Sequence, residues 1–120
     1  MVSSPDRGLT MDAMVASIRE TLSQGKTVSF IPGGNSMLPM LHPGKDIVVL
    51  SPLPEKLRKY DLPLYQRKDG QYVLHRVVRA GETYTCVGDN QFALEENLSH
   101  SQMIGLVTEF VRNGKRCRVR

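Results

Sequence analysis

Hydrophobic and polar residues alternate with two different periods along the chain, and the period changes after Gly25. Apolar residues before that point recur at the three- and four-residue spacing of one helix face: Met11, Met14, Val15, Ile18 and Leu22. Thr10 is a suitable N-cap and Gly25 a suitable stop signal. The pattern therefore predicts one amphipathic helix over residues 11–24.

Beyond the helix the pattern is typical of β-strands. Strands are predicted over residues 27–31, 46–50, 62–67, 72–78, 83–87, 105–112 and 115–120. Asp69-Gly70 and Asn113-Gly114 predict two hairpins, because such dipeptides tolerate the positive φ of tight turns between antiparallel strands. We therefore predict a mainly β protein of the α+β type, in which the N-terminal helix packs on a twisted, largely antiparallel β-core.

Composition places the chain among ordinary globular proteins. Its 120 residues, 40% hydrophobic and 23% charged, are enough for one domain with a real core. We expect a single domain over residues 1–120, with a flexible N-terminus at 1–9, the helix within 10–25 and the β-core at 27–120. No apolar run reaches the length of a signal peptide or a transmembrane segment, so the expectation is a soluble, cytoplasmic protein.

The chain has two cysteines, Cys86 and Cys117. Their number and spacing resemble neither a disulfide framework nor a metal site, so we expect two free thiols. No metal ion and no cofactor is expected from the sequence.

Basic residues are concentrated at the C-terminus. Five of the 16 lysines and arginines lie in the last nine positions, which leaves 11 basic against 12 acidic residues before them. Such a tail suits contact with nucleic acid, with an anionic membrane or with an acidic partner; alternatively it is a solvated strand whose charges discourage edge pairing. We favour the strand, because no aromatic residue interrupts the charges to stack on bases. The lack of a second helix also argues against a helix-turn-helix DNA reader.

His75 is a candidate general base. Alternation along the predicted strand places it on the same face as Val73 and Val77. Desolvation between two valines favours the neutral imidazole, which is the form that accepts a proton. The alternative is a structural core histidine bonded to a backbone carbonyl.

Ser36 is a candidate nucleophile. It stands in GGNSMLPM, residues 33–40, where a buried hydroxyl among apolar side chains requires a hydrogen-bond partner. One interpretation is a turn in which Asn35 and Ser36 bond their own backbone. The other is catalytic, because a serine becomes a good nucleophile when a neighbouring base takes its proton, and His75 supplies a base.

The order of several short segments resembles that of signal peptidases and LexA-like self-cleaving repressors, over about residues 27 to 112. The segments are GNSMLP (34–39), PGKDIVV (43–49), KYD (59–61), LHRVV (74–78) and GDN (88–90). The resemblance implies the β-core of those proteins and a serine endopeptidase activity on a peptide or protein substrate. The family's general base is a lysine or, in some branches, a histidine.

By that resemblance Ser36 is the nucleophile, His75 is the base and Asp89 orients the imidazole as the third member of a triad. Glu95 or Glu96 is the alternative orienting residue. The backbone N–H of Ser36 is the expected oxyanion donor. Gly34, Asn35 and Met37 are the expected substrate-binding residues, since the glycines before the serine leave room for an extended peptide.

The sequence departs from the family in ways that bear on function. The lack of a membrane anchor disfavours a secretory signal peptidase working at the bilayer. Ala80-Gly81 follows the histidine segment instead of preceding Ser36, which disfavours the self-cleavage of the repressors. Lys45 replaces the glycine that usually precedes the aspartate of the second segment. The alternative function is a non-catalytic peptide-binding or regulatory module with the same fold.

Overall fold

The computed structural model describes residues 11–31, 46–88 and 93–119, and these form one α-helix, a short 3₁₀ helix (His100–Gln102) and two antiparallel sheets. The α-helix is α1 (Met11–Ser23). The larger sheet contains β1 (Val28–Phe30), β2 (Ile47–Ser51), β3 (Pro63–Gln66), β4 (Tyr72–Leu74), β8 (Met103–Arg112) and β9 (Lys115–Arg118). The smaller sheet contains β5 (Arg76–Ala80), β6 (Tyr84–Val87) and β7 (Glu95–Leu98). The predicted mainly β architecture with an N-terminal helix is confirmed.

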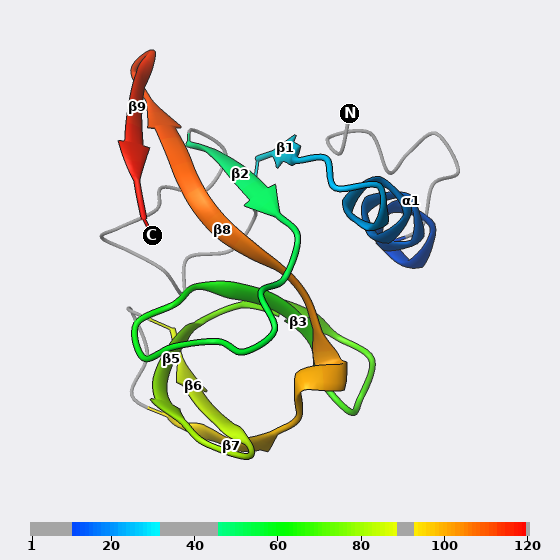
Figure 1. Cartoon of the computed structure of the whole chain (residues 1–120), viewed down its shortest axis with the longest axis vertical. Helices are drawn as coiled ribbons and strands as arrows, with labels where there is room; N and C mark the ends of the chain where they lie inside the picture. The colour runs from blue at the N-terminus through cyan, green and yellow to red at the C-terminus, as the bar shows by residue number, and fades with distance from the viewer. Residues whose placement is uncertain (1–10, 32–45, 89–92, 120) are drawn as a thin grey trace.

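Strand β8 organises the larger sheet, whose order is β1-β2-β8-β3-β4 with β9 also paired to β8. One edge of β8 pairs with β2 over Leu106–Val111. The other edge pairs first with β3 and then, near its end, with β9. In Figure 1, β8 consequently runs from the small sheet, where β5, β6 and β7 lie, to the β8–β9 hairpin at the opposite end of the molecule.

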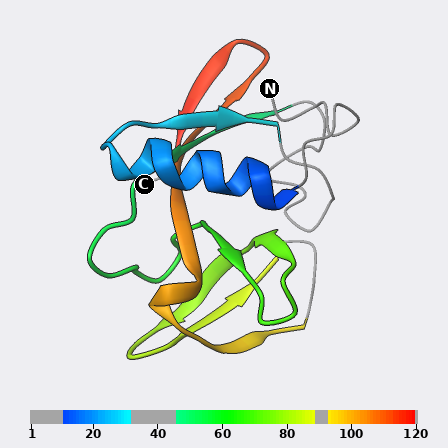
Figure 2. The same ribbon diagram turned by 90° about the vertical axis from the view of Figure 1, so that its right-hand side faces the viewer.

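Helix α1 covers the larger sheet with the face that the sequence pattern predicts. Val15, Ile18 and Leu22 are buried against that sheet, and Figure 2 shows the helix crossing in front of β8. The helix ends in a Schellman motif, in which Lys26 N–H donates to Thr21 O and Gly25, at φ +78°, donates to Leu22 O. The predicted stop at Gly25 is confirmed, whereas Thr10 and the side chain of Met11 lie outside the described residues.

The buried side chains form two clusters on opposite faces of β3 and β8. We call the cluster under α1 the helix-side core; it includes Leu50, Leu62, Leu64 and Val107. We call the other cluster the inter-sheet core, because it joins the larger sheet to the smaller one; its members are Leu57, Tyr65, Val77, Tyr84, Cys86, Leu98, Met103 and Leu106. Successive β3 residues point into different cores, as the two-residue period of a strand requires.

Both predicted hairpin turns are present. The β8–β9 turn places Asn113 at φ +53° and Gly114 at φ +76°, the conformation that Asn-Gly tolerates. The β3–β4 turn places Gly70 at φ +94°, and Arg67 N–H donates to Gln71 O across it.

The basic C-terminal segment is a strand, as we favoured. Strand β9 pairs with β8 from Arg112–Lys115 to Glu109–Arg118. The guanidinium of Arg112 donates to both carboxylate oxygens of Asp46, whose side chain is buried. Arg116 makes a more exposed pair with Glu109. These contacts give part of the tail a structural role.

The strand predicted over 72–78 is wrong as a single element, and one strand was missed. The chain leaves the larger sheet after Leu74 and enters the smaller sheet at Arg76, with His75 at the crossing point. The missed strand is β7, whose residues Glu95, Glu96 and Asn97 have low strand propensity. Strand β8 also begins two residues earlier than predicted, at Met103.

Cys86 and Cys117 are both free, and burial raises the pKa of Cys86 to about 12. Within the described ranges, no helix has the length and apolar character needed to cross a membrane.

Replacing Gly105 with alanine is expected to destabilise the fold by about 1–3 kcal/mol, the usual cost of overpacking a core. An added Cβ would lie 2.7 Å from Leu50 Cγ and 2.8 Å from Leu22 Cδ1, where helix α1 meets the larger sheet. Gly81→Ala is the matched control, because its Cβ would meet only Thr83 O, at 3.8 Å. Urea unfolding of both variants measures the difference, and equal stabilities would contradict the close packing at Gly105.

Candidate active site

His75 lies where the chain passes from β4 to β5, and its side chain is only 2% exposed. Of its neighbours two positions away, Val77 belongs to the inter-sheet core and the partly buried Val73 packs against that core. The sequence-based expectation that two valines flank a buried His75 therefore agrees with the structure. Its ring makes an edge contact with Tyr65, the two centroids being 6.0 Å apart at an interplanar angle of 76°.

A carboxylate and a phenol meet the same nitrogen of this histidine. His75 Nδ1 lies 3.1 Å from Glu95 Oε2 and 3.2 Å from Tyr65 Oη. The Tyr65 hydroxyl in turn donates to Glu95 Oε1 at 2.9 Å. The three groups form a closed polar triangle at the margin of an otherwise apolar core.

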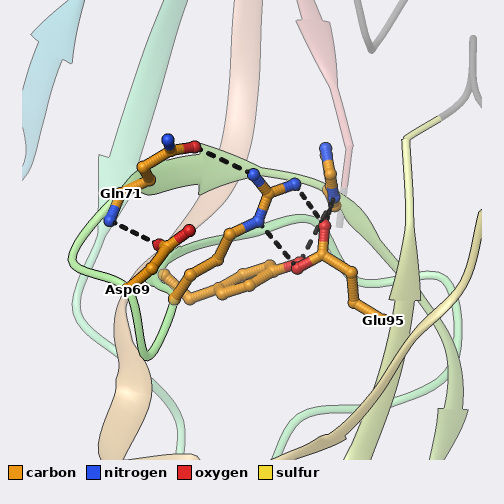
Figure 3. Close-up of polar contacts among 6 residues, drawn as sticks. Asp69, Gln71 and Glu95 are labelled. Carbon is orange, nitrogen blue, oxygen red and sulfur yellow. Dashed lines mark hydrogen bonds and ion pairs between the residues drawn. The ribbon is translucent and has the colours of Figure 1, made fainter.

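Arg67 fixes the carboxylate from its other side. Its Nε donates to Glu95 Oε1 at 3.0 Å and its Nη2 donates to Oε2, which makes a bidentate pair. Arg67 Nη1 also donates to Gln71 Oε1, and Gln71 N–H donates to Asp69 Oδ1 (Figure 3). Residues of the β3–β4 turn thus fix the position of Arg67, and Arg67 in turn fixes the Glu95 carboxylate.

These contacts set the charges of the site. Burial raises the pKa of Glu95, but hydrogen bonds from Arg67 and Tyr65, together with the positive charge of Arg67, outweigh burial and leave that pKa below its ordinary value. Burial, and then the hydrogen bond to Glu95, raise the pKa of Tyr65 far above its ordinary value. At neutral pH Glu95 is therefore a carboxylate and Tyr65 a neutral phenol.

Strand register brings Tyr65 to His75 and places Arg67 where it reaches Glu95, and sequence reasoning missed both residues. Tyr65 pairs with Val73 across the β3–β4 hairpin, which makes His75 the diagonal neighbour of Tyr65. Arg67 lies two positions after Tyr65 and so projects from the same side of the chain. The Asp69-Gly70 turn, which the sequence does predict, gives this register only for a three-residue loop over 68–70, since a two-residue loop would pair Tyr65 with Leu74.

Glu95 also reaches solvent. Its side chain is 22% exposed and lines a groove of about 390 Å³ between the β3–β4 turn and β7. The groove is lined by Arg67, Lys68, Asp69, Glu95, Glu96, Asn97, Leu98 and Gln102. His75 is thus enclosed, whereas the carboxylate beside it is accessible from this side.

The other predicted site residues fall mostly outside the described ranges. Ser36, with Gly34, Asn35 and Met37, lies in the segment 32–45, and Asp89 lies in 89–92, so their predicted roles stay predictions. Of the two glutamates considered as orienting residues, Glu95 contacts His75, and Glu96 is exposed. Among the residues that the structure describes, no group of three His, Cys, Asp or Glu side chains is placed to hold a metal ion.

Comparison with known proteins adds no further constraint. Neither the family models, the curated proteins nor the solved structures include a match to this chain.

Proposed function

We propose that this protein is a serine endopeptidase of the signal-peptidase-like kind, in which Ser36 is the nucleophile and His75 the general base. The observation that carries the proposal is the contact of 3.1 Å between His75 Nδ1 and the Glu95 carboxylate. In a serine peptidase of the triad type an acidic group holds the histidine base, and here a buried imidazole meets a carboxylate that is ionised and braced by Arg67. The ordered sequence segments around Ser36 and His75 support the same assignment.

In the proposed reaction, His75 takes the proton of the Ser36 hydroxyl as its oxygen attacks the peptide carbonyl. The backbone N–H of Ser36 donates to the oxyanion that forms. The imidazolium then gives its proton to the leaving amine, and water hydrolyses the acyl-enzyme by the same route. Glu95 stabilises the imidazolium while it carries the extra proton, and no cofactor takes part.

Two elements of the proposal rest on the resemblance. The first is the fold type: a helix packed on the larger of two antiparallel sheets is compatible with the LexA and signal peptidase architecture. The second is Asp89, which the resemblance assigns as the orienting acid. The contact with His75 leads us to assign that role to Glu95, and Asp89 becomes the alternative.

Labelling with a fluorophosphonate tests the proposal without knowledge of the natural substrate, because an activated serine attacks the phosphorus of this reagent, expels fluoride and becomes phosphonylated. Mass spectrometry of the wild-type protein is expected to find the label on Ser36. The label should be absent from Ser36→Ala and His75→Ala, and retained in His100→Ala, which removes a different tyrosine-bonded histidine. A wild-type protein that takes no label, or equal labelling of His75→Ala, would leave the peptide-binding module as the better reading.

A further inference from the structure

Two groups that lie against His75 Nδ1 favour a proton on that ring nitrogen. Ionised Glu95 has no proton and only accepts hydrogen bonds. Tyr65 has one proton, and it is directed to Glu95 Oε1 at 2.9 Å, so towards His75 the phenol offers only its oxygen. The Glu95 carboxylate and the Tyr65 oxygen therefore each present an acceptor to Nδ1.

A bare Nδ1 in this place would direct its lone pair at two oxygen lone pairs inside a buried site. Such an arrangement leaves polar groups unsatisfied in a low-dielectric environment and is costly. A protonated Nδ1 instead donates to both oxygens, at 3.1 Å and 3.2 Å.

We propose that Tyr65 and Glu95 together lock neutral His75 in the Nδ1–H tautomer, which leaves the lone pair on Nε2, and that Arg67 keeps the carboxylate in the orientation that the lock requires. Tyr65 and Arg67 are then positioning residues. Their importance for catalysis rests on the proposed function, since a base that receives the Ser36 proton at Nε2 must have its other proton on Nδ1. The tautomer itself does not depend on any activity.

His100 provides an internal control with the opposite expectation. Its Nδ1 lies 3.0 Å from Tyr84 Oη, and that oxygen already accepts the Leu57 N–H at 3.1 Å. With Leu57 N–H as one donor to this oxygen, donation of the Tyr84 proton to His100 Nδ1 satisfies the donor capacity of the phenol as well, and we expect that arrangement. Neutral His100 should accordingly be the Nε2–H tautomer, although it too is bonded to a tyrosine.

Long-range ¹H–¹⁵N correlation spectra of the imidazole rings test the lock, because protonated and bare ring nitrogens resonate far apart. The spectra are recorded on ¹⁵N-labelled protein at a pH where the imidazoles are neutral, and signals are assigned by single histidine replacements. We expect the Nδ1–H pattern for His75 and the Nε2–H pattern for His100 in the wild-type protein. The Nε2–H pattern for His75 would overturn the proposal, whatever the variants show.

The variants separate the two acceptors. Glu95→Gln can present an N–H to His75, so the Nε2–H tautomer should become its major form. Tyr65→Phe keeps the ring and removes one acceptor, so a minor Nε2–H population should appear. Tyr84→Phe should alter the His100 signals and leave those of His75 unchanged. Wild-type His75 signals in both Glu95→Gln and Tyr65→Phe would show that these residues do not set the tautomer.

The test also distinguishes this proposal from the proposed function. If the wild-type protein shows the expected tautomers but takes no label on Ser36, the tautomer proposal stands and the peptidase assignment fails. If Ser36 is labelled but His75 is in the Nε2–H form, the peptidase assignment stands and the tautomer proposal fails.

Discussion

Ser36→Ala and His75→Ala are each expected to lower kcat/KM for a cleaved peptide by about 10⁴- to 10⁶-fold, the range seen when a member of a serine triad is removed. Each substitution removes a group on which the chemical step depends, so the loss should appear in kcat and not in KM. The double variant should lose little more than either single one, because groups that act as a unit are not additive. Initial rates on a peptide that the wild-type protein cleaves provide the measurement.

The two candidate orienting acids are compared in the same assay. Glu95→Gln is expected to reduce kcat by roughly 10²- to 10⁴-fold, since an amide can favour the wrong tautomer of the base. Asp89→Asn should be milder. The reverse order would return the orienting role to Asp89, and wild-type turnover in both Ser36→Ala and His75→Ala would remove the peptidase assignment altogether.

Deleting residues 112–120 is expected to lower the thermal midpoint by at least about 10 °C, which is large for a domain of this size. The deletion removes strand β9 and exposes an edge of β8. It also removes the guanidinium that compensates the buried carboxylate of Asp46. Calorimetry or circular dichroism on heating measures the change.

Two single substitutions separate the contributions to this loss. Arg112→Met removes the pair with buried Asp46 and should lower the midpoint clearly. Arg116→Met removes the more exposed pair with Glu109 and should change it by less than about 2 °C. An unchanged midpoint in the full deletion would refute the structural role of β9, and salt-dependent binding of an anionic partner would then explain the basic residues.

The elements that the sequence predicts well are those whose signals are local. Helix α1 has an apolar face at helical spacing and a glycine stop, and the two hairpins have turn dipeptides that require positive φ. Each of these signals lies within a few residues of the element that it specifies. Local signals were therefore sufficient for the helix, both turns and most strand positions.

The errors have a non-local cause. Residues 72–78 read as one strand because every residue suits a strand, and only the separate partners of β4 and β5 divide them at His75. Strand β7 was missed because it is an edge strand of the smaller sheet. It also carries Asn97 at φ +59°, next to an irregularity in its pairing with β6. Such a strand is specified by its neighbour and not by its own residues.

The candidate site was likewise predictable only where its signal was local in the sequence. The burial of His75 between valines follows from alternation, and Glu95 was considered as its partner. Tyr65 and Arg67 required the hairpin register to be worked out, and the approach of β7 to the hairpin is a tertiary contact that no local pattern indicates.

The two sheets meet at His75, and this has a consequence for the order of events in folding. Tyr65 and Arg67 come from the β3–β4 hairpin, Glu95 comes from β7 of the other sheet, and the histidine belongs to the crossing between them. A nascent chain that has formed the hairpin but not yet docked β7 holds an imidazole without its carboxylate. In the proposed peptidase the base therefore gains its carboxylate only when β7 docks, so a chain that has formed the hairpin alone is not yet active.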